Sequence, residues 1–90
     1  MEPVAADLAR VAQRLLRDLP AAEAIATAWP LVCGSNVAVK TPIESLQGTV
    51  LTVRVPSREW LNELNALRGV YLNKLNELCP AAVTEIKFVT

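Results

Sequence analysis

The side chains that usually carry out chemistry in enzymes are scarce in this 90-residue chain. It has no histidine, so the commonest general base, proton shuttle and metal ligand is missing. Its two thiols, Cys33 and Cys79, lack the CxxC spacing typical of zinc sites and redox pairs. A cysteine without a histidine partner is a poor catalytic nucleophile. The sequence therefore predicts a binding protein that is not an enzyme and has no metal site and no cofactor.

The remaining candidates for function are basic side chains that could bind a partner. Arg10, Arg14 and Arg17 follow one another at spacings of four and three, which places them on one face of a helix. Such a stripe suits contacts with phosphates or with an acidic protein. The alternative is an ordinary solvated face, partly neutralised by Asp7 and Asp18. The sequence alone leaves both interpretations open.

A second candidate patch combines basic residues from two predicted strands. Arg54 and Lys87 occupy outward positions of strands that could be neighbours, and Arg58 follows just beyond. Together they could form a small basic surface on the open face of a sheet. Because Glu59 and Glu85 are close in sequence, the alternative is the mixed charge of an ordinary exposed sheet.

Arg68 is the least expected of the charged residues. Helical spacing places it inside an apolar arc, between the directions of Leu61 and Leu75. A charge in that position must extend to solvent, pair with a carboxylate or mark the edge of an interface. We expect a structural ion pair, with a contact to a partner as the alternative.

The two tryptophans also have two interpretations. Trp29 and Trp60 could stack on bases, as aromatic residues do in proteins that bind single strands. Both, however, lie on apolar stripes at helical spacing. We therefore expect both to be core anchors that pack two helices against a sheet.

Length, composition and charge limit the class of protein. An apolar content of 52% supplies one core, and the length fits a single domain over residues 1–90. The net charge of +0 argues against strong autonomous binding to nucleic acid, which depends on cationic contacts. No apolar run approaches a membrane span, and the first residues are acidic rather than basic. We expect a cytoplasmic protein with reduced cysteines; a disulfide between Cys33 and Cys79 is the alternative.

Helical patterns occupy the first part of the chain. Residues 4–19 are predicted as a helix that ends before Pro20. A second helix begins near Ala21 and stops at Gly34, with a kink or restart at Pro30. Residues 35–40 form either another helical turn or irregular chain. The apolar stripe of the first helix comprises Val4, Leu8, Val11, Leu15 and Leu19.

Strand patterns alternate with one further long helix. Residues 42–47 and 49–55 are predicted as strands joined at Gly48, and residues 83–89 as a third strand. Between them a helix capped by Ser57 should extend to about Leu78, where Pro80 prevents continuation. The inward residues should be Leu51, Val53, Val55, Ile86 and Phe88. The order helix–helix–strand–strand–helix–strand predicts an α+β sandwich, with helices packed on one face of a three-stranded sheet.

The order of several short motifs resembles a known bacterial family. The first is Ala28-Trp29-Pro30-Leu31-Val32-Cys33-Gly34, and Thr41-Pro42 and Gly48-Thr49-Val50-Leu51-Thr52-Val53-Arg54-Val55 follow. Ser57-Arg58-Glu59-Trp60-Leu61-Asn62-Glu63-Leu64, Leu72-Asn73-Lys74-Leu75-Asn76 and Ile86-Lys87-Phe88 complete the pattern. Over about residues 8–88 the chain is similar to the DciA family.

The resemblance implies a fold, a partner and a role. The fold would be similar to KH domains, although the GxxG loop by which true KH domains clamp nucleic acid is not present here. The role would be that of an accessory protein of bacterial DNA replication, which binds the replicative helicase DnaB and, weakly, single-stranded DNA. No P-loop is present, as the resemblance to a family without ATPase activity implies. The alternative is a protein-interaction module with no role at nucleic acid.

Overall fold

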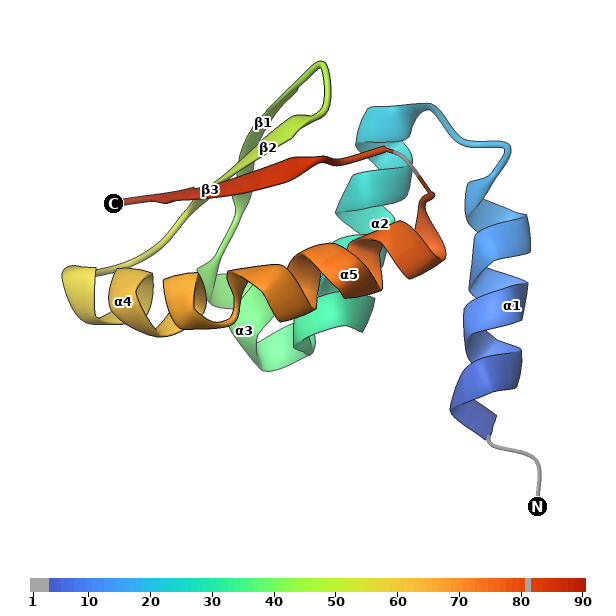
Figure 1. Cartoon of the computed structure of the whole chain (residues 1–90), viewed down its shortest axis with the longest axis horizontal. Helices are drawn as coiled ribbons and strands as arrows, with labels where there is room; N and C mark the ends of the chain where they lie inside the picture. Colours follow the sequence, from blue (N-terminus) through green and yellow to red (C-terminus); the bar gives the residue numbers. More distant parts are fainter. Residues whose placement is uncertain (1–3, 81) are drawn as a thin grey trace.

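The computed structural model describes residues 4–80 and 82–90, with side chains from residue 10 onward. The fold is α+β, with helices packed on one face of a three-stranded mixed sheet, as predicted (Figure 1). The helices of the described residues are α1 (Val4–Leu16), α2 (Ala21–Cys33), α3 (Ser35–Lys40), α4 (Arg58–Ala66) and α5 (Arg68–Leu78). The strands are β1 (Ile43–Gln47), β2 (Val50–Arg54) and β3 (Glu85–Val89).

The strand order in the sheet is β1-β2-β3. β1 and β2 pair antiparallel through a tight turn in which Gly48 has a φ of 62°, a conformation that favours glycine. β2 and β3 pair parallel, with Leu51 opposite Ile86 and Val53 opposite Phe88. A parallel pair needs a long crossover, and α4 and α5 supply it. This arrangement agrees with the KH-like fold that the family resemblance implies.

Alternation along the strands decides which face of the sheet the helices cover. Leu51 and Val53 of β2 and Ile86 and Phe88 of β3 are all buried, whereas the residues between them are more exposed. Val55 is buried as well and extends the pairing, because its amide donates to the carbonyl of Val89 at 2.7 Å. The predicted inward residues are therefore confirmed.

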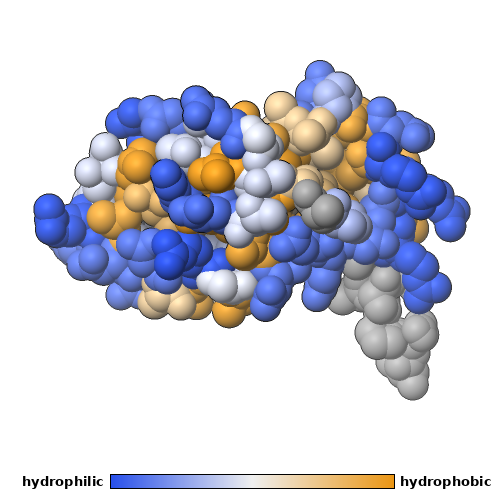
Figure 2. Space-filling view, turned by 45° about the horizontal axis from the view of Figure 1, so that its top comes forward, coloured by the Kyte–Doolittle hydropathy of each residue, from blue (hydrophilic) through white to orange (hydrophobic). Residues whose placement is uncertain are grey.

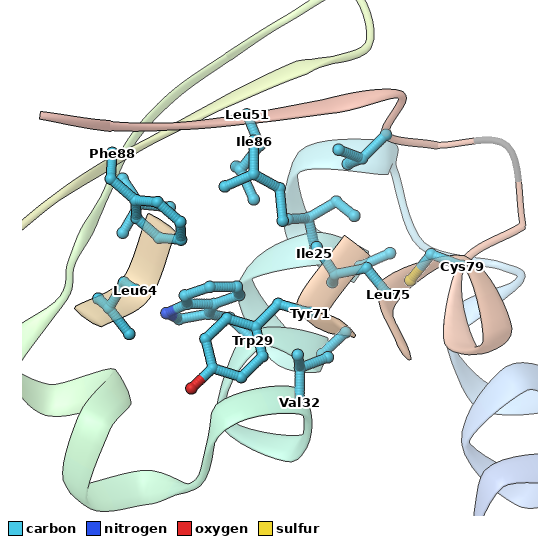
Figure 3. Close-up of a cluster of buried hydrophobic side chains, with 14 of the residues drawn as sticks. Ile25, Trp29, Val32, Leu51, Leu64, Tyr71, Leu75, Cys79, Ile86 and Phe88 are labelled. Carbon is cyan, nitrogen blue, oxygen red and sulfur yellow. The ribbon is translucent and has the colours of Figure 1, made fainter. Parts of the chain in front are cut away.

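The core lies between the sheet and helices α2 and α5 (Figure 3). Trp29 is 2% exposed and meets the ring of Tyr71 edge-on at 5.7 Å between centroids. Its indole Nε1 donates to the hydroxyl of Thr41 at 3.0 Å, and that hydroxyl donates to the carbonyl of Val37 at 2.8 Å. Trp29 is thus a core anchor, as predicted. Trp60 is half-buried and packs against the same core from α4.

Helix ends in the middle of the chain follow their sequence signals. α2 continues through Pro30 without restarting and ends at Gly34, whose φ is 90°. Residues 35–40 form α3, which selects the helical alternative. Ser57 caps α4, because its hydroxyl accepts a hydrogen bond from the amide of Trp60 at 3.3 Å.

Two predicted helix boundaries are wrong. The long helix predicted to reach Leu78 without interruption is divided at Leu67, where φ of −100° and ψ of 3° leave the helical region and the amide bonds to the carbonyl of Leu64. Gly69 lowers the helical preference beside this break. α1 ends at Leu16 rather than Leu19, because the amide of Leu19 bonds to the carbonyl of Leu16 in a tighter turn and Pro20 disfavours helix in the residue before it.

Candidate binding surfaces

Among the described side chains, Ala12, Gln13 and Leu16 connect α1 to the rest of the domain. α1 stands at one end of the molecule and packs against α5 and α2 (Figure 1). Leu16 is buried in the core and Ala12 is partly buried against it. The side-chain amide of Gln13 donates a hydrogen bond to the carbonyl of Glu77 in the last turn of α5. Small and polar residues therefore form most of the described contact.

Two large apolar residues of α1 and a third just beyond it are exposed. Leu15 is 69% exposed and Val11 is 53% exposed, and Leu19 just beyond the helix is 38% exposed. We refer to Val11, Leu15 and Leu19 as the α1 ridge. The part of the predicted apolar stripe that these residues form is exposed, because the helix turns its Ala12 and Leu16 side to the domain. The side chains of Val4 and Leu8, which continue the same spacing in the sequence, lie outside the described residues.

The arginine stripe comprises Arg10, Arg14 and Arg17, and all three side chains are exposed. Within residues 10–80 and 82–90 no carboxylate lies at ion-pair distance from Arg14 or Arg17. Hydrophilic residues dominate the right-hand side of the view in Figure 2, where α1 lies. Arg14 and Arg17 are therefore accessible to an acidic group of a partner. The role of the stripe stays a prediction.

A cleft of about 440 Å³ opens between the end of α1, the start of α2 and the end of α5. Its walls are mainly apolar, and Gln13 and Arg17 supply polar atoms. Leu19 lines this cleft, whereas Val11 and Leu15 do not. The cleft is lined by Gln13, Leu16, Arg17, Leu19, Ala21, Ala24, Leu78, Cys79, Pro80 and Ala82.

The predicted basic patch on the sheet is only partly assembled. The register places Lys87 opposite Thr52, so Lys87 and Arg54 lie on the same outward face of adjacent strands. Arg54, however, forms an ion pair with Glu44 of β1 and donates to the carbonyl of Thr90 at 3.5 Å. Arg58 is exposed at the first position of α4. Because one of its cations is neutralised, this face offers less positive charge than the sequence suggests.

Arg68 is exposed at the first position of α5, and the ion pair expected for it is wrong. No carboxylate of the described side chains lies at ion-pair distance from it. The break at Leu67 explains the difference, since it changes the direction of the following residues relative to an unbroken helix. Leu67 and Val70 beside it are 41% and 49% exposed, so a contact with a partner stays a prediction for Arg68.

The two thiols are free rather than joined in a disulfide, as predicted. Burial raises the pKa of the Cys33 thiol, and a backbone hydrogen bond partly offsets that rise. Burial also raises the pKa of the Cys79 thiol. Both thiols are therefore less available as thiolates than a free cysteine, which is the opposite of what a nucleophile needs.

The described residues contain neither a cluster of metal-ligating side chains nor a membrane-spanning helix. In residues 4–80 and 82–90 no group of three or more His, Cys, Asp or Glu side chains comes together to hold a metal ion. No helix of the same residues has the length and apolar character to cross a membrane.

Sequence reasoning identified the apolar stripe of the first helix but missed its exposure and the cleft. A signal for them is present, because Ala5, Ala9, Ala12 and Leu16 form a second apolar face of the helix beside the valines and leucines. Small residues let two helices approach closely, so an alanine-rich face can be the packing face even where larger residues stand next to it. Periodicity alone does not decide between two adjacent apolar faces.

Comparison with known proteins places the chain in a family. The family model described as "Dna[CI] antecedent, DciA" matches residues 3–88 of the 90 residues. No match to a curated protein is found. The DciA family is associated with loading of the replicative helicase DnaB, which supports an accessory role in DNA replication. With the match extending over nearly its whole length, this chain belongs to the DciA family.

Proposed function

We propose that this protein is a non-enzymatic accessory protein of bacterial DNA replication that binds the replicative helicase DnaB. The observation that carries the proposal is the family match over residues 3–88. The chemistry of the chain supports it, because the sequence has no histidine and burial raises the pKa of both thiols. Binding rather than catalysis is the activity that these side chains suit.

Weak binding to single-stranded DNA is the second part of the proposal. It rests on exposed cations at Arg14, Arg17, Arg58, Arg68 and Lys87, with Arg54 contributing less because Glu44 pairs with it. The net charge of +0 limits the strength of such binding, since affinity for a phosphate backbone grows with the number of cations that meet it. The competing function is a protein-interaction module that does not contact nucleic acid.

Direct binding measurements test both parts. The purified chain is titrated against the DnaB hexamer of the same bacterium by interferometry, and a single-stranded oligonucleotide is run in parallel at low and moderate salt. We expect saturable binding to the helicase, and weak DNA binding that falls steeply as salt rises. Helicase binding without DNA binding would favour the interaction module. Failure to bind the helicase at any salt would contradict the proposed function.

A further inference from the structure

The cleft between α1, α2 and α5 reaches the hydrophobic core of the domain. Leu16, Ala24 and Cys79 line it and are also members of the core, with 5%, 5% and 7% of their surface exposed. Figure 3 shows Cys79 at the end of the core cluster that lies toward α1. A side chain of a partner that entered the cleft would therefore contact apolar atoms at its base.

The outer part of the cleft is formed by exposed residues. Leu19 is 38% exposed, and Ala21 and Pro80 are exposed as well. The cleft is thus open to solvent along its rim while its base is buried. With a volume of about 440 Å³ it can accept a large apolar side chain.

Arg17 supplies the charge of the cleft. Among the described residues that line the cleft it is the one ionised side chain. Within residues 10–80 and 82–90 no carboxylate lies at ion-pair distance from it. Gln13, the other polar side chain of the lining, donates its amide hydrogen bond to the carbonyl of Glu77. The guanidinium of Arg17 is therefore accessible to an anionic group, and a carboxylate matches its geometry.

The combination of apolar walls and one cation selects the chemistry of a partner. A large apolar side chain next to an aspartate or glutamate satisfies both parts, since one group fills the cleft and the other pairs with Arg17. A nucleic-acid strand offers phosphates to Arg17, but the described lining has no aromatic ring on which a base could stack. The cleft therefore suits a protein segment better than it suits DNA.

A second copy of the chain fits the cleft less well. A two-fold dimer presents the same surface on both copies, so it would set one cleft against the other. Neither cleft would then be filled, and Arg17 of one copy would lie near Arg17 of the other. Like charges placed together at an interface oppose association.

We propose that this cleft is the docking site for a segment of the replicative helicase in which a large apolar side chain adjoins a carboxylate. The inference rests on the proposed function, which supplies the helicase as the protein that carries the segment. The apolar side chain enters the cleft between Leu16, Leu19 and Leu78, and the carboxylate pairs with Arg17 at the rim.

Two variants of the full chain, each with a matched control, test the site by titration against the DnaB hexamer. Arg17→Glu reverses the charge in the cleft, and Arg14→Glu makes the same change at an exposed arginine that does not line it. Ala21→Phe fills part of the cleft, and Ala22→Phe adds the same ring at the next exposed position of α2, outside the lining. All four positions are exposed, so melting temperatures should match that of the unaltered chain.

We expect Arg17→Glu and Ala21→Phe to weaken helicase binding by roughly tenfold, and both controls to bind within about twofold of the unaltered chain. The loss in Arg17→Glu should shrink at higher salt, whereas the loss in Ala21→Phe should not. Binding by either cleft variant at the level of the unaltered chain would overturn the docking site and leave the proposed function standing. Absence of binding by the unaltered chain would overturn both.

Alkylation of the two thiols by iodoacetamide reads out where the helicase lies. Cys79 lines the cleft and Cys33 does not, so saturating helicase should slow alkylation of Cys79 several-fold more than that of Cys33. Equal slowing at both thiols, or none at Cys79, would overturn the site.

Sedimentation without helicase tests the other occupant. We expect the unaltered chain and Ala21→Phe to sediment alike, and a dimer of the unaltered chain that Ala21→Phe abolishes would overturn the assignment to the helicase.

Discussion

The core around Trp29 and the attachment of α1 differ in how much of their apolar surface is buried. Trp29 is 2% exposed, contacts the rings of Tyr71 and Phe88, and has its indole nitrogen hydrogen-bonded to a fully buried Thr41. On α1, Leu16 is buried but Leu15 next to it is 69% exposed. Burial of apolar surface is the main stabilising term in folding. We refer to α2, α5 and the sheet as the body, and α1 leaves more large apolar surface exposed than the body does around Trp29.

Trp29→Ala should have the largest effect on stability. Removing a buried tryptophan leaves a cavity at the centre of the core, and we expect a loss of about 3–5 kcal/mol of unfolding free energy. Urea denaturation followed by circular dichroism measures the loss. Trp60→Ala is the matched control, with a smaller loss because Trp60 is half-buried. Equal losses for the two tryptophans would contradict the placement of Trp29 at the centre of the core.

Leu16→Ala and Leu15→Ala make the sharpest test of how α1 is attached. We expect Leu16→Ala to cost about 2–3 kcal/mol, since Leu16 is the buried contact of α1. Leu15→Ala should change stability by less than about 0.5 kcal/mol, as is usual for an exposed position. Hydrogen exchange should show lost protection in α1 for Leu16→Ala and unchanged protection in β2. A larger loss for Leu15→Ala would mean that α1 packs through its ridge.

Thr41→Val tests the polar contact within the core. The substitution keeps the shape of the side chain but leaves the buried indole N–H of Trp29 without its acceptor. We expect a loss of about 1–3 kcal/mol in unfolding free energy. Thr27→Val, at an exposed position of α2, is the control and should change stability little. No loss for Thr41→Val would show that the hydrogen bond contributes nothing net.

The body could be predicted from the sequence because its signals agree with one another. Alternation along β2 and β3 identified Leu51, Val53, Ile86 and Phe88, and each of these is buried. Gly34 ends a helix and Gly48 forms a turn, both with positive φ. At such positions local preference and tertiary structure favour the same conformation, so reasoning from short segments succeeds.

The surface of α1 could not be predicted in the same way. Its sequence carries two neighbouring apolar faces, one with Val11 and Leu15 and one with Ala12 and Leu16. Hydrophobicity favours the first face, whereas the structure packs the second against α5, where Gln13 also bonds to the carbonyl of Glu77. The break at Leu67 was missed for a related reason. One residue leaves the helical region there, and Gly69 nearby is a weak signal for it.

The smallest expected effect comes from the two thiols and shows itself in the pH dependence of stability. Burial raises the pKa of Cys33 and of Cys79 above the ordinary value of 9.0, so the folded state holds each proton more tightly than the unfolded chain does. This contribution to stability is fully present below pH 9.0 and is lost as the pH rises through the raised pKa. Cys33 belongs to the body, whereas Cys79 lines the cleft beside α1.

We therefore expect the urea midpoint to fall as the pH rises above 9.0, and the fall to be smaller in Cys33→Ala/Cys79→Ala. Burial, followed by the charge of Cys33, also raises the pKa of Tyr71 above its ordinary 10.0, so Tyr71 adds to the slope only above pH 10.0. The single variants Cys33→Ala and Cys79→Ala show how much of the pH dependence of stability comes from each thiol. If Leu16→Ala removes the contribution of Cys79 and leaves that of Cys33, α1 is what shields Cys79 from water. If both contributions survive Leu16→Ala, the body alone buries both thiols, and α1 is even less tightly coupled to it than its contacts suggest.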